Sequence, residues 1–182
     1  LNGTNLVINA NAFESANITS LSIDGSNVRV LASAFVNNLI EELELKGTII
    51  ETGTDAFKNN QLEDEDAFIM GRDSSGNETA VLTSYGGKNR SSIALPNKVE
   101  SVTATFSSLG ITGQFDTGDG LTNVSNNMFS SNSLTSVRIG NSVTNIGYDA
   151  FSYNKIATLS LGNSVETIGY RAFANNQIKE LI

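Results

Sequence analysis

The chain has 182 residues, of which 39% are hydrophobic and 16% are charged. This is the composition of a globular protein and excludes a chain that is disordered by composition. The net charge of -8 disfavours nucleic acid or an anionic membrane as the main partner. Because Cys and His are absent, disulfides, a thiol nucleophile and acid–base catalysis by His are excluded.

Phenylalanine recurs at a nearly constant interval along the chain. Seven of the nine phenylalanines are separated by 22, 22, 49, 23, 22 and 22 residues: Phe13, Phe35, Phe57, Phe106, Phe129, Phe151 and Phe173. Alanine precedes five of them, and Thr105 or Met128 precedes the other two. Such a fixed period indicates a repeat architecture.

Each repeat predicts one coil of a solenoid. In the last full copy, Leu159–Leu161 alternates with period two, which predicts a strand with one buried face. Gly162–Ser164 predicts a turn, and Val165–Ile168 a second short extended segment. Ala172-Phe173 is expected to begin a single turn of α- or 3₁₀-helix. One coil cannot bury its apolar edge alone, so the coils should stack and the Phe rings should form one internal column.

Asparagine follows the same period. It occurs three residues after the Phe in five coils, at Asn38, Asn60, Asn132, Asn154 and Asn176. A buried Asn can satisfy backbone donors and acceptors at a bend that every coil repeats. We therefore expect a structural column of asparagines and no catalytic role for them.

Two segments, 141–154 and 163–176, share the pattern Asn-Ser-Val-x-x-Ile-Gly-x-x-Ala-Phe-x-x-Asn. This pattern resembles the BspA-like (treponemal-type) class of bacterial leucine-rich repeats, and the resemblance covers the chain except for 63–90. It implies a curved, right-handed solenoid with a parallel sheet on one face. It also implies a bacterial cell-surface or secreted protein with an adhesion role.

The predicted fold is thus a mainly β solenoid with short helical or 3₁₀ turns, a parallel sheet and one β-hairpin excursion. We expect residues 1–182 to form a single domain of seven or eight coils, with repeats at 1–62 and 91–182. An irregular β-hairpin insertion is expected at about 63–90. Its strands are predicted at 66–70 and 79–85, with a turn between them.

Three acidic segments could each hold a cation: Glu63–Asp66, Asp73–Glu78 and Phe115–Gly120. Full calcium-loop spacing is missing from the second segment, where a plain hairpin turn is favoured. The third segment falls at a coil corner, where Asp and Gly are expected anyway, and the first is best interpreted as a solvated face. No metal and no cofactor are therefore predicted.

The outward positions of the predicted sheet form a strip across successive coils. They carry short hydroxyls and an acidic patch, at Ser20, Ser22, Glu42, Glu44, Gln114, Ser136, Arg138, Thr158, Ser160 and Glu180. This strip is either a ligand-binding face or a solubilising face with no ligand. Tyr148, Tyr153 and Tyr170 lie near the Phe corner, as another contact surface or as local packing.

No recognisable pair of acid–base groups or phosphate-binding loop is present, so the chain is not expected to be an enzyme. The leading hypothesis is a protein-interaction or adhesion module that binds a host or neighbouring-cell protein. A structural spacer is the alternative, and carbohydrate binding is a third hypothesis. No membrane insertion is expected, because no apolar run approaches 18 residues. Neither end shows a polar capping coil, so we expect a fragment of a longer exported protein.

Overall fold

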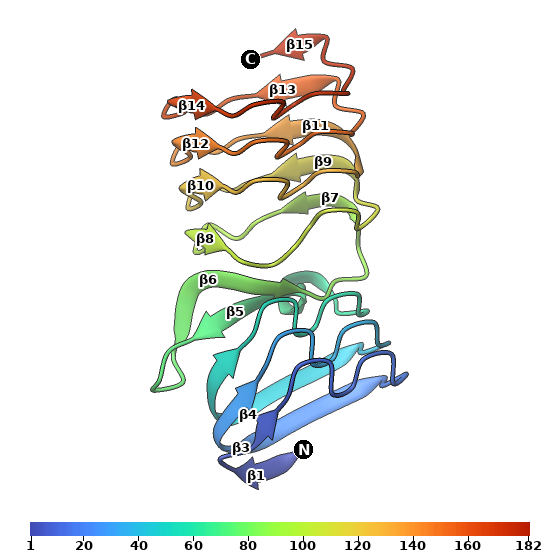
Figure 1. The fold of residues 1–182 in the computed structure, drawn as a ribbon, viewed down its shortest axis with the longest axis vertical. Coiled ribbons are helices and arrows are strands. Elements are labelled where there is room, and N and C mark those ends of the chain that lie inside the picture. Colours follow the sequence, from blue (N-terminus) through green and yellow to red (C-terminus); the bar gives the residue numbers. More distant parts are fainter. The chain divides into compact units, whose positions relative to one another are not determined.

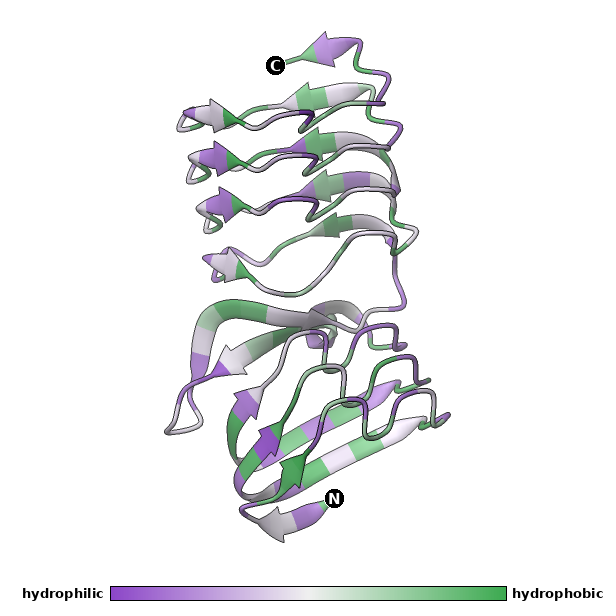
Figure 2. Cartoon of the chain, in the orientation of Figure 1, coloured by the Kyte–Doolittle hydropathy of each residue, from purple (hydrophilic) through white to green (hydrophobic). Residues whose placement is uncertain are grey.

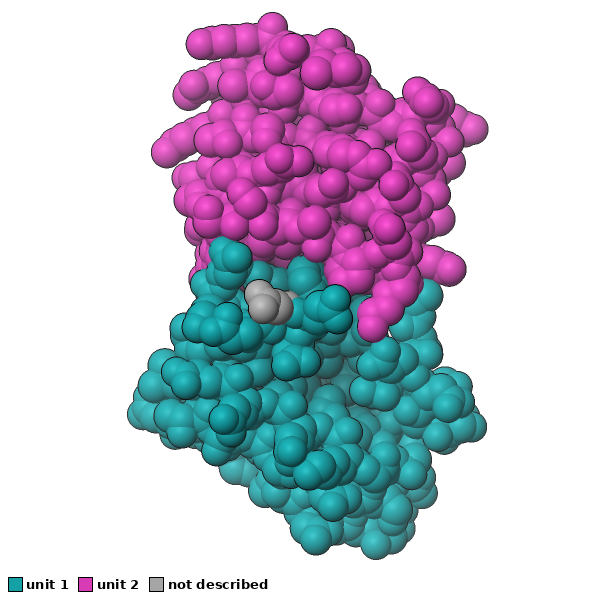
Figure 3. Space-filling model, turned by 180° about the vertical axis from the view of Figure 1, so that it is seen from behind, with its two compact units in different colours: residues 1–89, 103–105 teal, residues 90–102, 106–182 magenta. Residues whose placement is uncertain are grey.

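The computed structural model describes every residue from 1 to 182 except the side chain of Asp64. The chain is a mainly β solenoid of about eight turns, as predicted. It forms two compact units, residues 1–89 with 103–105 and residues 90–102 with 106–182 (Figure 3), and each unit is described by itself. That residues 1–182 make a single domain stays a prediction.

Unit 1 contains six strands and one 3₁₀ helix. In chain order these are β1 (Asn2–Thr4), β2 (Val7–Ile8), β3 (Ser20–Val30), β4 (Glu42–Thr52), η1 (Asp64–Ala67), β5 (Phe68–Arg72) and β6 (Glu78–Tyr85). Unit 2 contains nine short strands. These are β7 (Ser91–Ala94), β8 (Ser101–Val102), β9 (Thr112–Asp116), β10 (Asn123–Val124), β11 (Ser133–Arg138), β12 (Asn145–Ile146), β13 (Thr158–Ser160), β14 (Thr167–Ile168) and β15 (Glu180–Leu181).

Unit 2 carries two parallel sheets (Figure 1). One has five strands in the order β15-β13-β11-β9-β7, and the other has three in the order β10-β12-β14. Ser136 pairs with Thr158, and Thr158 pairs with Glu180. The register therefore advances by one 22-residue repeat per strand, which confirms the predicted parallel sheet.

A tight turn separates the two strands of each coil in the C-terminal part of unit 2. A Cβ atom on Gly140 would lie 1.7 Å from the carbonyl oxygen of Gly118, and one on Gly162 would lie 2.2 Å from that of Gly140. Only glycine allows coils to approach so closely. In the next position the Oδ1 of Asn141 accepts the N–H of Asn163 at 3.2 Å, so the turns are also linked by side chains.

Unit 1 departs from this pattern, because β3 and β4 run unbroken through 11 residues each where the repeat predicts two strands and a turn. β3 pairs with β1 and β2 on one side and with β4 on the other. The register between β3 and β4 shifts between Gly25 and Val28, and Asn27 and Gly47 have φ values of 59° and 70°. These left-handed residues bend the strands in place of a turn. Figure 2 shows hydrophobic and hydrophilic residues alternating along both strands.

The predicted hairpin is confirmed. β5 and β6 are antiparallel, and the Oδ1 of Asp73 accepts the N–H groups of Ser75 and Asn77 at 2.8 and 2.9 Å. The aspartate thus stabilises a plain turn, as the sequence indicates. The first strand begins two residues later than predicted, because residues 66 and 67 belong to η1. On β6, the Oγ of Ser84 accepts the N–H of Phe57 at 3.0 Å, so the hairpin takes the place of a following coil.

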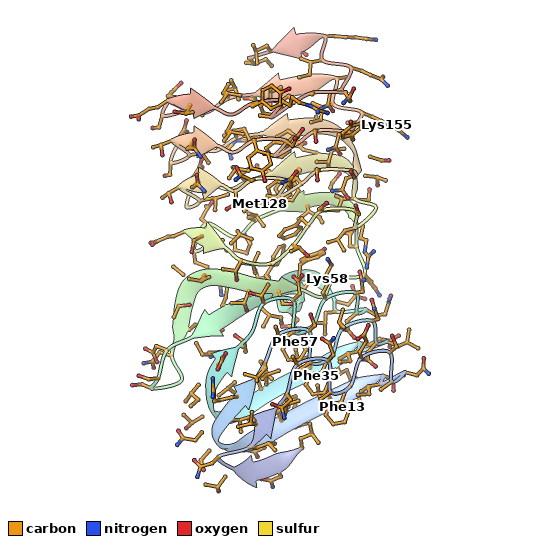
Figure 4. The ribbon with its side chains drawn as sticks, viewed as in Figure 1. Phe13, Phe35, Phe57, Lys58, Met128 and Lys155 are labelled. Carbon is orange, nitrogen blue, oxygen red and sulfur yellow. The ribbon has the colours of Figure 1, made fainter. Side chains whose placement is uncertain are left out.

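Each unit contains a column of Phe rings, stacked face to face except for Phe106 and Phe129, whose rings are tilted by 43°. In unit 1 the ring centroids of Phe13, Phe35 and Phe57 are 5.1 and 5.5 Å apart, and these side chains follow one another from coil to coil (Figure 4). In unit 2 the successive distances between Phe106, Phe129, Phe151 and Phe173 are 5.2, 5.0 and 5.3 Å. The aromatic column is confirmed within each unit, and its continuity through all seven rings stays a prediction.

The asparagine column is confirmed as well. The Nδ2 of Asn154 donates to the carbonyl oxygens of Phe129 and Phe151 at 3.0 and 3.1 Å, and its Oδ1 accepts the N–H of Leu134 at 3.1 Å. Equivalent bonds are made by Asn38, Asn60, Asn132 and Asn176. Each asparagine therefore joins two consecutive coils and satisfies three backbone groups.

The corner at Ala-Phe consists of consecutive reverse turns. Ala172 and Ala174 donate their N–H groups three residues back, to Gly169 and Arg171, which is the spacing of a 3₁₀ helix. Residues two before and two after the Phe have φ between 50° and 58°, and this left-handed backbone prevents a helix from continuing. They are Asn11, Ser33, Asp55, Asn127, Asp149 and Arg171 before it, and Ser15, Asn37, Asn59, Ser108, Ser131, Tyr153 and Asn175 after it.

Candidate functional site

The predicted strip lies on the outward face of the parallel sheets. In unit 2 the main sheet aligns Gln114, Ser136, Thr158 and Glu180 on successive strands. Gln114 and Glu180 are exposed, and the residues between them are half-buried, whereas the alternate residues Phe115, Val137 and Leu159 are buried. The second row of this face is Arg138 beside Ser160.

In unit 1 the corresponding face is shorter. Ser20 lies beside Glu42 and Ser22 beside Glu44, and all four side chains are exposed. The structure thus brings the predicted residues together in two groups, four in unit 1 and six in unit 2. Within each group they form a regular row, because the strands are parallel and in register.

Glu44 is not a free carboxylate. Its Oε2 lies 2.8 Å from the Nζ of Lys46, which is two residues along the same strand and therefore on the same face. The hydrogen bond from Lys46, and then the one from Ser22, lowers the pKa of Glu44, and the pairing raises the pKa of Lys46. Lys46 was not predicted as the partner of Glu44, although the period of two along a strand is enough to identify it.

Arg138 is likewise paired within the chain. Its Nη1 lies 2.8 Å from the Oδ1 of Asp116, and its Nη2 lies 2.7 Å from the Oδ1 of Asp119. These hydrogen bonds raise the pKa of Arg138, Asp116 contributing most. Asp116 stands 22 residues before Arg138, so the repeat period alone could have identified the pair. Arg138 therefore links two coils as well as facing outward.

Unit 2 is expected to lose stability in acid partly through Asp119. The pKa of Asp119 is lowered, first by the N–H of Asn141 and then by the guanidinium group of Arg138. Because the folded pKa lies below the unfolded one, its stabilisation is present above about pH 4 and is lost as the pH falls through the folded pKa. Asp119→Asn keeps an oxygen acceptor for Asn141 but loses the charge. Urea unfolding between about pH 5 and pH 2 should show a shallower loss of stability for this variant than for the wild type; equal slopes would contradict the assignment.

A hollow of about 300 Å³ lies on the turn side of unit 1. Its lining is almost entirely polar and comes from three successive coils: Asn11, Glu14, Ser33, Val36, Asn37, Asp55, Lys58 and Asn59. Two of its three charged groups are engaged, because Lys58 lies 3.7 Å from Asp55 and both side chains bond to the hydroxyl of Thr105. Besides this pair, the hollow presents the carboxylate of Glu14 and neutral amides and a hydroxyl.

The corner of the last two coils of unit 2 carries an exposed aromatic cluster. Tyr148, Tyr153 and Tyr170 are 48%, 55% and 78% exposed. Arg171 contacts Tyr153: its Nη2 donates to the hydroxyl of Tyr153 at 3.0 Å, and its guanidinium carbon is 5.9 Å from the centre of that ring. Such exposure favours the interpretation as a contact surface over that of local packing.

Tyr153 and Arg171 occupy strained positions. Both have the left-handed backbone described above, with φ of 54° and 56°. This conformation costs most residues about 1–2 kcal/mol, and Asn or Asp tolerate it more readily. Wherever another coil has the left-handed backbone at these two positions, the residue is Asn, Ser or Asp. The exposed hydrogen bond and cation–π contact between Tyr153 and Arg171 stabilise the fold by only about 0.5–1 kcal/mol. This is less than the free energy that the two left-handed positions cost.

Among the side chains that the structure describes, no three His, Cys, Asp or Glu residues are grouped so that they could hold a metal ion. The acidic run at 63–66 includes Asp64, whose side chain lies outside the described part; Glu63, Glu65 and Asp66 are exposed, and Glu63 pairs with Lys88. None of the helical structure described here has the length and apolar character needed to cross a membrane.

The sequence matches the family described as "BspA type Leucine rich repeat region" in six copies, over residues 5–67 and 83–182. No curated protein and no solved structure gives a significant match. The residues between the two matched segments are those of β5, the hairpin turn and the first half of β6, so the structural irregularity and the break in the family pattern coincide. The period, the stacked coils and this match lead to one conclusion: the chain belongs to the BspA-type leucine-rich repeat family.

Proposed function

We propose that the chain is a non-catalytic module that binds a protein ligand through the outward face of its parallel sheets. The observation that supports this most directly is the regular row of exposed or half-buried side chains on successive strands of one sheet. Solenoids commonly use such a surface for binding, and repeats of this family are commonly protein-interaction modules. We further propose an adhesion role at a bacterial cell surface, as part of a longer exported protein.

The chemistry of the face favours a protein over a sugar. It consists of short hydroxyls, amides and ion pairs that are satisfied within the chain, such as Arg138 with Asp116. The described face contains no aromatic side chain on which a sugar ring could stack. A flat polar row of this kind suits a broad protein surface, where many small contacts and bridging waters contribute.

A panel of matrix and cell-surface proteins tested by surface plasmon resonance should contain a saturable ligand. The double variant Ser136→Arg, Thr158→Arg places two bulky side chains in the centre of the face and should weaken that binding at least about tenfold. Thr167→Arg, on the other sheet of the same unit, is the matched control and should leave binding unchanged. Equal loss in both variants, or no loss in either, would contradict the assignment of the face.

One observation favours the second candidate function, a structural spacer. Two of the charged groups of the face are already paired within the chain, Glu44 with Lys46 and Arg138 with two aspartates. A spacer requires no ligand, so a complete absence of binding on the protein panel would support it. Binding to a glycan array alone would instead support the carbohydrate hypothesis.

A further inference from the structure

We propose that Tyr148, Tyr153, Tyr170 and Arg171 form a second protein-contact surface in unit 2, the tyrosine surface, which binds an acidic segment of a partner protein. The proposal rests on the proposed function in one respect, that the chain binds protein, but it names a different surface. The tyrosine surface lies at the turns beside the Phe corner, whereas the face described above is formed by β7, β9, β11, β13 and β15.

The exposure of the tyrosines is selective. Of the four tyrosines in the chain, Tyr85 is 5% exposed, and the other three gather at this corner. Tyr148 remains exposed although the next coil is stacked on its own, with the N–H of Asp149 donating to the carbonyl oxygen of Tyr170 at 3.0 Å. Its exposure is therefore a property of the stacked coils. Tyrosine and arginine are the residue types that carry much of the binding energy at protein interfaces.

The backbone supplies an independent argument. Tyr153 and Arg171 hold the left-handed positions at which other coils have Asn, Ser or Asp, which adopt that conformation at lower cost. Backbone strain that the rest of the fold does not require is concentrated at functional sites. A bulky aromatic and a bulky cation at two such positions, in contact with each other across consecutive coils, point to selection for binding rather than for stability.

The charges of the surface indicate the chemistry of the partner. Arg171 and the exposed Lys155, two residues after Tyr153, are cations in a chain with a net charge of -8. Asp149 is the counter-charge, with its Oδ1 3.5 Å from the Nε of Arg171, and that oxygen is buried without a hydrogen-bond partner among the described residues. Asp149 thus pairs with the Nε of Arg171 and Tyr153 accepts from its Nη2, while the remaining guanidinium N–H groups and the tyrosine hydroxyls can donate to a ligand. Carboxylates are the acceptors that such a set of donors prefers.

The test uses a display library of random linear peptides selected on the whole chain. Wild type is expected to enrich peptides rich in Asp and Glu, and the best of these should bind the double variant Tyr153→Asn, Arg171→Asn at least about tenfold more weakly. Tyr153→Asn introduces a residue that other coils use at this position, so this single variant should raise the midpoint of thermal unfolding by about 2–4 °C. Arg171→Asn relieves the same backbone strain but also removes the counter-charge of Asp149, so no gain in stability is expected from it. Weaker binding by the single variant Tyr153→Asn together with its higher stability cannot come from unfolding.

The sheet-face variant Ser136→Arg, Thr158→Arg is the matched control and should bind the acidic peptide as the wild type does. If this binding is retained, the tyrosine surface binds the peptide independently of the sheet face. That conclusion holds whether or not the sheet face itself binds a protein. The proposal is overturned if the enriched peptides carry no excess of acidic residues or if the asparagine variant binds them equally well. It is also overturned if Tyr153→Asn is less stable than the wild type, or if only glycans bind at this surface.

Discussion

Replacing Phe129 with alanine is expected to lower the free energy of unfolding of unit 2 by about 3–5 kcal/mol. The ring is fully buried and packs against three others, with centroid distances of 5.2 Å to Phe106, 4.2 Å to Phe115 and 5.0 Å to Phe151. Its removal leaves a cavity that stacked coils cannot close, because backbone hydrogen bonds hold their spacing. Urea unfolding followed by circular dichroism measures the loss.

Phe173→Ala is the matched control for this prediction. Phe173 belongs to the same column but is only half-buried and stacks on one ring, so its replacement should cost clearly less. The expected difference in the loss of unfolding free energy between the two variants follows from the different burial of the two rings. Similar costs for Phe129→Ala and Phe173→Ala would show that the aromatic column does not stabilise unit 2 through packing.

Asn154→Ala is expected to lower the free energy of unfolding of unit 2 by about 2–4 kcal/mol. The substitution removes the partners of two carbonyl groups and one N–H group at once, those of Phe129, Phe151 and Leu134. Each buried group left unsatisfied costs about 1–3 kcal/mol, and a small movement of water into the corner would offset part of the sum. The same urea measurement tests this effect.

A second asparagine provides the comparison. Asn145 lies in the neighbouring column and donates to the Oδ1 of Asn123 at 2.7 Å, but this bond is exposed to solvent. Asn145→Ala should therefore change the free energy of unfolding by less than about 0.5 kcal/mol. If both alanine variants lost the same amount, hydrogen bonding in the buried column would not be the reason that Asn recurs at five corners of the repeat.

Much of the fold could be predicted from spacing. Residues 22 positions apart in the two cleanest copies, such as Val137 and Leu159, pair in the sheet because each coil repeats the geometry of the last. The hairpin was predictable from Asp73 and the turn residues after it. The long strands β3 and β4 were not, because their bend depends on left-handed residues such as Asn27, and an isolated Asn fits a turn equally well.

The candidate site was predictable only in outline. Alternation along the strands places Ser136 and Thr158 outward, and the structure agrees. The pairing of Arg138 with Asp119 and the strain at Tyr153 and Arg171 were not predicted. The first depends on how a side chain crosses from strand to turn, and the second depends on backbone angles that emerge only when coils stack.

The amino-acid sequence by itself determined the period, the residues that face inward and the family, because a 22-residue repeat imposes the same environment on each equivalent position. Only the tertiary structure decided which polar groups are paired, where a turn becomes a continuous strand, and which residues bear a left-handed backbone. These features arise between coils, where hydrogen-bond distances and close backbone approach are set by stacking and not by any one segment of the chain.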